Sequence, residues 1–257
     1  MLHLLKRTRA IPGILILLAA LAARAEASVP DYIAAAVADP ARPLQDQARD
    51  RERKAAEVLA FSGIGPGARV ADFMSGGGYF TRLMSRIVGD TGKVYAFLPE
   101  EELRNCVPQE TAGTLALEHD ARYANVSVLR SPVKQFHAPE PLDLVWTSLN
   151  FHDLYDAFME HADVPAVTQA LYRALKPDGV LLVIDHAAQP HSGIRDTEKL
   201  HRIDPQVIIS AALAAGFRLD ARSDLLRNPA DTHQLLVFDP RIRGRTDQVI
   251  LKFRKPR

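Results

Sequence analysis

The 257-residue sequence has little of several features that mark specialised protein classes. Its only cysteine is Cys106, so no internal disulfide can form and a small disulfide-stapled fold is excluded. Glycine and proline follow no repeat, and 47% of the residues are hydrophobic, which excludes collagen and a disordered chain. Basic and acidic residues number 32 and 31, so no excess of positive charge suggests binding to nucleic acid. The remaining class is a globular protein, and the length suits one α/β domain with a sizeable core.

Residues 1–27 have the pattern of a secretory signal peptide. Three basic residues precede an apolar stretch at residues 11–23, and small-x-small cleavage sequences follow, ending at Ala25 and Ala27. About 13 apolar residues fall short of the ~20 that cross a bilayer. We therefore expect the leader to be removed on export, leaving a periplasmic or secreted protein without stable membrane insertion. An uncleaved membrane anchor is the alternative. Loss of the four basic residues in this segment lowers the formal charge from +1 to about −3.

The rest of the chain divides into an N-terminal helical segment, residues 28–65, and a larger domain, residues 66–257. In the first part we expect a helix around residues 47–61. In the second, apolar strand-like runs alternate with amphipathic helical patterns. The strand-like runs are residues 69–74, 93–98, 126–129, 142–149, 180–185, 218–223 and 248–253. Such alternation predicts a mostly parallel sheet covered on both faces, with ligands at the carboxyl ends of the strands.

Three consecutive glycines join the first predicted strand to its helix. We call residues 75–78, Ser-Gly-Gly-Gly, the glycine turn; Asp72 precedes it and Tyr79 follows it. Glycines let the backbone approach a ligand closely, and the turn offers N–H groups at a helix N-terminus. The sequence matches neither a phosphate-binding P-loop nor the dinucleotide pattern G-x-G-x-x-G. A tight turn without a ligand is the alternative explanation.

Two stretches resemble motifs of class I S-adenosylmethionine-dependent methyltransferases. VADFMSGGGYFTRLM is similar to their motif I, and LYRALKPDGVLLVID is similar to a later motif at the fifth strand. The resemblance extends over residues 63–256 and makes residues 66–257 a methyltransferase-fold domain. It implies a Rossmann-like, seven-stranded, mostly parallel sheet with helices on both faces and the last strand antiparallel. It also implies S-adenosylmethionine as cofactor and a small molecule as methyl acceptor. The residues it assigns to the cofactor are Asp72, Ser75, Gly76, Gly77, Gly78 and Glu100.

The chain departs from the family pattern at three positions. Met74 stands where the first glycine of motif I is expected. Leu98 occupies the position of the acid that binds the cofactor's ribose, and Glu100, two residues later, is the substitute. Arg130 follows the third strand in place of the usual acidic contact to the adenine. More narrowly, the chain is similar to uncharacterised exported bacterial predicted methyltransferases that share its GGGY, HDL, DH and LHRID sequences.

Histidines and carboxylates follow the fourth and fifth predicted strands. His152-Asp153 resembles the His-Asp pair that supplies a general base in small-molecule O-methyltransferases of this fold, and a neutral imidazole can accept a hydroxyl proton near neutral pH. We expect Asp153 to orient His152. Asp185-His186 should lie beside this pair, with His201, Arg202 and Asp204 on the next connection. Helix capping is one alternative role. A zinc or iron site is another, but no closely spaced histidine pair supports it, and no metal ligand is assigned.

These features predict methyl transfer from S-adenosylmethionine to an unidentified small molecule, with His152 as base. The alternative is a non-catalytic exported protein that binds a ligand or a metal on a degenerate methyltransferase fold. This alternative has two physical grounds: the cofactor is made in the cytosol, and two of the expected acidic contacts to it are missing. The pattern carries no prediction of the oligomeric state.

Overall fold

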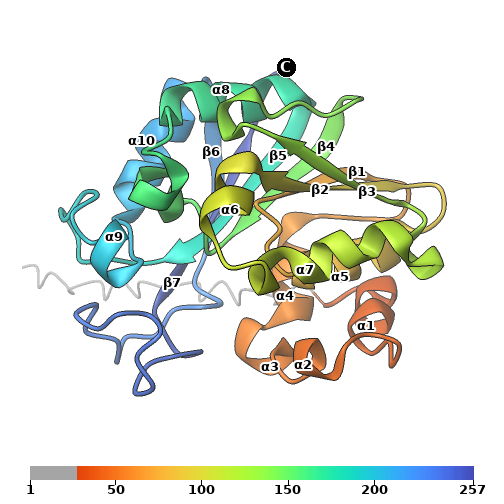
Figure 1. Ribbon diagram of the computed structural model, residues 1–257, viewed down its shortest axis with the longest axis horizontal. Helices are drawn as coiled ribbons and strands as arrows, with labels where there is room; N and C mark the ends of the chain where they lie inside the picture. The colour runs from red at the N-terminus through yellow and green to blue at the C-terminus, as the bar shows by residue number, and fades with distance from the viewer. Residues whose placement is uncertain (1–27) are drawn as a thin grey trace, which may run out of the picture.

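The computed structural model describes residues 28–257, and the predicted signal peptide lies outside them. Its centre is a seven-stranded sheet in the order β3-β2-β1-β4-β5-β7-β6 (Figure 1). The strands are β1 Arg69–Phe73, β2 Lys93–Pro99, β3 Val126–Ser131, β4 Leu142–Ser148, β5 Leu175–His186, β6 Arg218–Ser223 and β7 Gln248–Arg254. Strands β1 to β5 pair in parallel, and β7 runs antiparallel to both of its neighbours. The predicted fold class is confirmed.

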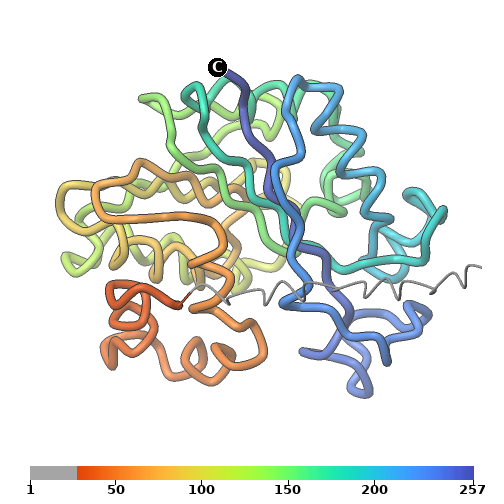
Figure 2. The backbone as a smooth tube through the Cα atoms, turned by 180° about the vertical axis from the view of Figure 1, so that it is seen from behind, coloured from red at the N-terminus to blue at the C-terminus, as the bar shows by residue number. Residues whose placement is uncertain are grey.

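The inner strands are mostly buried because both faces of the sheet are covered, whereas the edge strands β3 and β6 carry polar, more exposed residues. Alternate residues point to opposite faces, so Val70 and Trp146 join one core and Ala71 and Val145 the other. The first face is covered by helices α1, α4 and α5, and the second by α8 and α10 (Figures 1 and 2). Their bounds are α1 Asp31–Val37, α4 Ala55–Ser62, α5 Tyr79–Val88, α8 Val164–Ala174 and α10 Pro205–Ala214.

Sequence signals at the helix starts explain why α8 and α10 begin where they do. The Asp163 side chain accepts a hydrogen bond from the Ala166 N–H at 3.1 Å, and the Asp204 side chain accepts one from the Gln206 N–H at 2.9 Å. A proline in the first turn of each helix fits because its missing N–H would have no helical partner there. Asp204 therefore has a structural role.

The N-terminal segment forms α1 and three further short helices, so the single helix expected around residues 47–61 is wrong. The chain forms α2 Leu44–Gln47, α3 Asp50–Arg53 and α4, and it turns at Lys54, whose φ is 43°. Residues 50–54 are all charged and offer no apolar stripe to bury, whereas α4 packs into the core. The turn at Lys54 lets the charged helix α3 lie at the edge of the sheet while α4 packs into the core.

The remaining helices and 3₁₀ turns lie in the connections between the strands. They are α6 Glu100–Asn105, α7 Gln109–Leu115 and α9 Thr197–Leu200, with 3₁₀ turns η1 Ala116–His119, η2 Ala121–Tyr123, η3 Val133–Gln135, η4 His152–Tyr155 and η5 Ala157–Met159. Within residues 28–257, no helix has the length and apolar character needed to cross a bilayer.

Candidate functional site

The glycine turn lies between the end of β1 and the start of α5. It is held by hydrogen bonds from the Ser75 N–H to the Phe97 carbonyl at 3.0 Å and from the Gly78 N–H to the Ser75 carbonyl at 2.9 Å. Gly76 and Gly78 have φ values of 48° and 77°, a region that glycine enters without strain. The N–H groups of Gly76 and Gly77 have no acceptor among residues 28–257. The turn therefore presents two unused donors at a helix N-terminus.

The carbonyl groups of the same turn are already bonded to the protein. The Thr114 hydroxyl donates to the Gly76 carbonyl at 2.7 Å, and the Arg82 guanidinium donates to the Gly77 carbonyl at 2.8 Å. Helix α7 lies so close that a Cβ on Gly113 would be 2.4 Å from the Gly77 carbonyl oxygen. With its acceptors used and its donors unused, the turn suits an anionic group.

Met74, at the position of the first family glycine, adopts a left-handed backbone conformation with φ of 59°. Its carbonyl accepts a hydrogen bond from the Asn150 side-chain amide, and its side chain is buried in the core between the sheet and helices α8 and α10. The backbone conformation of the motif is kept although the residue has a Cβ. Asn150 thereby links the end of β4 to the glycine turn.

Asp72, at the end of β1, lies beneath the turn. The Thr81 hydroxyl donates to its carboxylate at 2.6 Å. Burial raises the pKa of Asp72 to about 7, although the hydrogen bond from Thr81 and the charges of Arg53 and Arg82 favour the ionised form. Its predicted place beside the glycine turn agrees with the structure.

Arg53, which the sequence did not single out, lies beside the same turn. Its guanidinium carbon is 4.5 Å from the ring centre of Tyr79 and 5.4 Å from that of Phe80. Burial lowers its pKa to about 10, and Asp72 lies within electrostatic range. No carboxylate in the described part of the chain forms an ion pair with it. Arg53 is thus a nearly buried cation available to a ligand.

The three acids after β2 point in different directions. Glu100 is half exposed and lies 3.5 Å from Arg104, while Glu101 accepts hydrogen bonds from the Val133 N–H. Glu102 is buried, and its Oε2 atom has no partner in the described residues. Burial and the carboxylates of Asp153, Glu110 and Asp72 raise the pKa of Glu102 to about 8. The acid nearest to both parts of the site is therefore Glu102, although sequence spacing selected Glu100.

The other two family departures are structural. Leu98 is fully buried in the sheet, and the Arg130 guanidinium pairs with the Glu118 carboxylate at 3.1 Å. Neither side chain is available to a cofactor.

His152 is the centre of the second part of the site. It follows β4 in η4, and its backbone N–H and its Nδ1 atom contact the two carboxylate oxygens of Asp185, at 2.8 and 2.7 Å. Its Nε2 atom faces Asp153 Oδ1 at 3.0 Å and His201 Nδ1 at 3.2 Å. The convergence expected from the sequence is thus present for His152, Asp153, Asp185 and His201.

The pKa of His152 is well above its ordinary value. Burial alone would lower it, but the Asp185 and Asp153 carboxylates outweigh that effect. This differs from the expectation that the imidazole of His152 has its ordinary pKa and accepts a proton near neutral pH. The two carboxylates therefore favour the protonated imidazole of His152.

Two further residues, His186 and Asp156, complete this region, and the sequence pattern did not indicate Asp156. His186 lies beside His152, with ring centres 6.2 Å apart, and burial lowers its pKa well below the usual value. Asp156 ends η4 and is 1% exposed. One ligand atom from each of four side chains lies within 4.8 Å of the other three. We call these four, His152, Asp153, Asp156 and His201, the histidine cluster. Arg202 lies outside it, in a buried ion pair with Asp231.

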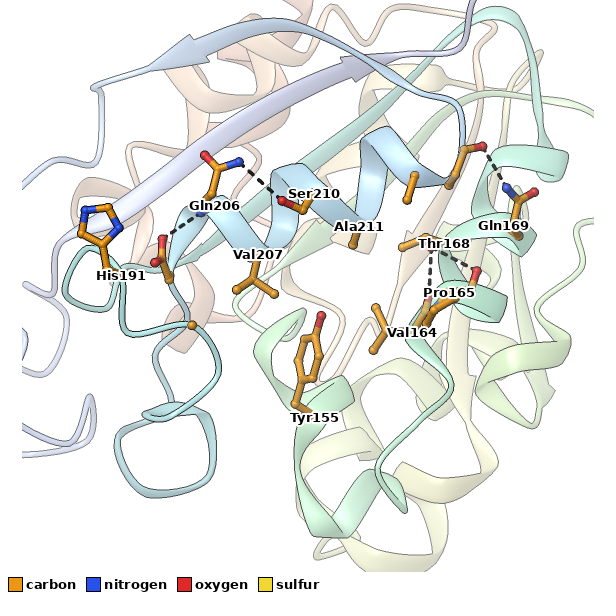
Figure 3. A pocket seen from close by; sticks show the side chains of 14 residues that line it. Tyr155, Val164, Pro165, Thr168, Gln169, His191, Gln206, Val207, Ser210 and Ala211 are labelled. Atoms are coloured by element: carbon orange, nitrogen blue, oxygen red, sulfur yellow. Dashed lines mark hydrogen bonds between the residues drawn. The ribbon is translucent and has the colours of Figure 1, made fainter.

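A cavity of about 660 Å³ opens between α8 and α10 (Figure 3). Tyr155, the last residue of η4, points into it, and its walls are formed by Val164, Pro165, Val207 and Ala211 among others. Thr168, Gln169 and Gln206 add a few polar groups. Through Tyr155 the cavity adjoins the helix turn that carries His152.

Comparisons with known proteins give relatives by sequence and by fold. No family model matches the chain. It is 25% identical over 182 residues to the ubiquinone/menaquinone biosynthesis C-methyltransferase UbiE of Vibrio parahaemolyticus and 27% identical over 184 residues to that of Escherichia coli. Each match spans 69% of this chain and 65–67% of the relative, so about a third of the relatives' length has no counterpart in the match.

Solved structures show the same fold. A putative sarcosine dimethylglycine methyltransferase from Galdieria sulphuraria has a TM-score of 0.56 at 17% identity, over 83% of this chain and 88% of that one. A [4+2]-cyclase, SpnF, has a TM-score of 0.57 at 16% identity, over 85% and 84% of the two chains. The fold is that of the class I methyltransferases. The two relatives matched by sequence are C-methyltransferases by name.

Proposed function

We propose that this protein is an S-adenosylmethionine-dependent methyltransferase that acts on a small, largely apolar molecule. The observation that carries the proposal is the glycine turn, with unused N–H donors, at the end of β1, an inner strand of a methyltransferase-type sheet. Fold alone does not fix function, so the proposal depends on how the residues suit the two ligands.

The residues around the glycine turn fit the chemical groups of the cofactor. A carboxylate suits the unused N–H groups of Gly76 and Gly77 and the guanidinium of Arg53. Ser75 and Gly78 hold the turn in shape, and Asp72 supports it from below. An acid beside the turn suits ribose hydroxyls. We assign that role to Glu102, because Glu100 is half exposed and faces Arg104. The cofactor would supply an electrophilic methyl group on a sulfonium sulfur.

The cavity between α8 and α10 is the proposed acceptor site. Its volume of about 660 Å³ is that of a small-molecule pocket, and mostly apolar walls with few polar groups are typical of such pockets. The UbiE relatives are C-methyltransferases of quinone biosynthesis by name. We propose an apolar acceptor with an ionisable hydroxyl group, whose loss of a proton activates it.

For the proton we retain His152 as base and Asp153 as its partner. Asp185 fixes the orientation of the imidazole through Nδ1, which leaves Nε2 directed at Asp153 and His201. His152 is 2% exposed, whereas the His201 side chain is 27% exposed. As a base His152 must be in its neutral form, and a proton from the acceptor would then reach it through His201. Such a base contributes about 10²–10⁴-fold to a rate.

Export remains a separate proposal that depends on residues 1–27 alone. Their basic, apolar and small-residue pattern supports a cleaved signal peptide and a periplasmic or secreted protein. The narrower group of exported predicted methyltransferases is proposed on the shared GGGY, HDL, DH and LHRID sequences. N-terminal sequencing of the protein recovered from the periplasm tests it, and an intact Met1 would contradict cleavage.

Calorimetric titration of the purified protein with S-adenosylmethionine and its demethylated product tests the main proposal. We expect micromolar binding that Gly77→Ala weakens at least tenfold. A Cβ there would be 3.6 Å from the Glu110 carbonyl oxygen, an ordinary contact, so the variant should fold. Gly65→Ala is the matched control, since its Cβ would be 3.7 Å from the Tyr32 hydroxyl, away from the turn.

The alternative is a non-catalytic binding protein on the same fold. It is favoured by Leu98 and Arg130, which replace two expected acidic contacts and face other partners. The [4+2]-cyclase neighbour shows that this fold can serve other chemistry. Absence of cofactor binding at millimolar concentration would favour this alternative and overturn the methyl-transfer proposal.

A further inference from the structure

The histidine cluster contains a buried acid that the protein leaves without a partner. Asp156 is 1% exposed, and neither of its carboxylate oxygens has a hydrogen-bond partner among residues 28–257. The nearby Thr197 hydroxyl donates to the Ile194 carbonyl at 3.2 Å instead. Buried carboxylates are ordinarily paired or bound to a metal, because an isolated charge is costly in the interior.

Three other ligand atoms converge beside this acid. His152 Nε2 lies 3.0 Å from Asp153 Oδ1 and 3.2 Å from His201 Nδ1, and the last two atoms are 3.6 Å apart. Ligand atoms that sit 2.0–2.1 Å from a tetrahedral ion lie about 3.3–3.4 Å from one another. The three observed distances, 3.0, 3.2 and 3.6 Å, lie on both sides of this value. An Asp156 oxygen is within 4.8 Å of all three atoms, so it is the candidate for the fourth corner.

The surroundings also suit a metal ligand at His152. Its Nδ1 atom contacts the buried Asp185 carboxylate at 2.7 Å, which leaves Nε2 as the coordinating nitrogen. A carboxylate behind a histidine is the usual support of a metal-binding imidazole. Asp153, Asp156 and Asp185 together also bring more negative charge to this region than the imidazoles offset, which favours a cation.

We propose that the histidine cluster binds one divalent transition-metal ion through two imidazole nitrogens and two carboxylate oxygens. This ligand set, without thiolate, suits Zn²⁺, Fe²⁺ or Mn²⁺. The sequence did not assign it because the ligands come from η4 and from the end of α9, 49 residues apart at the two histidines. The site is independent of cofactor binding at the glycine turn, but it replaces the proposed role of His152 as base. With the ion bound, His152 Nε2 is a ligand and no longer a proton acceptor.

The test is calorimetric titration of chelator-treated, full-length protein with ZnCl₂, and the visible spectrum after adding CoCl₂ as a tetrahedral probe. We expect one equivalent of Zn²⁺ at micromolar affinity or tighter, and a tetrahedral Co²⁺ spectrum. Asp156→Asn and His201→Ala should each weaken Zn²⁺ binding at least tenfold. Glu160→Gln and His191→Ala, exposed residues outside the cluster, are the matched controls and should change nothing.

Thermal unfolding separates a ligand from a merely structural acid. Asp156→Asn removes a buried charge without a partner, so the metal-free variant should be at least as stable as the wild type. The increase in Tm caused by Zn²⁺ should shrink in the variant, because stabilisation by a ligand follows its affinity. Absence of binding, or stoichiometric binding unaffected by both cluster variants, would overturn the proposal. Neither result would alter cofactor binding at the glycine turn, which is measured separately without metal.

Discussion

Two groups of polar atoms meet the carboxyl edge of the sheet, one on the backbone of the glycine turn and one on the side chains of the histidine cluster. In the turn, every acceptor near the ligand position is bonded to protein, and only N–H donors are unused. In the cluster, a buried carboxylate has no partner and three acids lie close together. The shape of the glycine turn is thus held by the protein without a ligand. The negative charge of the histidine cluster, in contrast, is balanced only when a proton or a cation is present.

The largest effect should come from removing the support of the cluster. Asp185 is fully buried and accepts hydrogen bonds from the N–H groups of His152 and His186 and contacts His152 Nδ1. Asp185→Ala leaves these donors buried without an acceptor, and we expect a loss of about 3–5 kcal/mol in unfolding free energy. Urea denaturation measures it. The exposed helix cap Asp163→Ala should cost only about 1 kcal/mol. If Asp185→Ala and Asp163→Ala lost the same unfolding free energy, Asp185 would not be a special support of the histidine cluster.

The next effect concerns the acid beneath the glycine turn. The folded protein holds the Asp72 proton up to about pH 7, whereas the unfolded chain releases it near 3.8. The folded state therefore binds more protons in between, and unfolding free energy should fall as pH rises from about 4 to about 7. The fall is at most about 4 kcal/mol. Asp72→Asn should remove this part of the slope. If the unfolding free energies of the wild type and of Asp72→Asn changed with pH in parallel, the raised pKa of Asp72 would be contradicted.

A smaller effect should follow from separating α7 from the turn. Gly113→Ala places a Cβ 2.4 Å from the Gly77 carbonyl oxygen, so the backbone must shift. Overpacking of this kind costs about 1–3 kcal/mol, and we expect weaker cofactor binding because the turn moves. Calorimetry and thermal unfolding measure the two changes. Gly65→Ala, where the added Cβ meets no close backbone atom, should behave as wild type.

The smallest effect tests the unused cation of the turn. Arg53→Met keeps an apolar stem against Tyr79 but removes the charge proposed to meet the cofactor. We expect about a tenfold loss of cofactor affinity, or about 1.4 kcal/mol, with little change in stability. The exposed neighbour Arg51→Met is the control. Equal affinity in both variants would remove Arg53 from the proposed site.

The fold was predictable because its signals are local. Apolar runs bounded by glycine and proline marked the strands, and resemblance to known motifs supplied their number and the antiparallel last strand. The break at Lys54 was not predictable from periodicity, since it depends on where α4 docks. In the site, Asp72 and His152 were found from strand ends. Glu102 and Asp156 were missed, because the direction of a side chain on a short helix depends on the packing of that helix.

The strained backbone at Met74 has a consequence for how such a chain can change. Glycine at this position would relieve a left-handed conformation that costs about 1–2 kcal/mol. It would also leave a void, because the Met74 side chain packs in the core with neighbours such as Phe73 and Val145. A void of that size costs about 2–5 kcal/mol, more than the relief gained. Replacement of Met74 by glycine is therefore uphill in this core, even though it relieves the backbone.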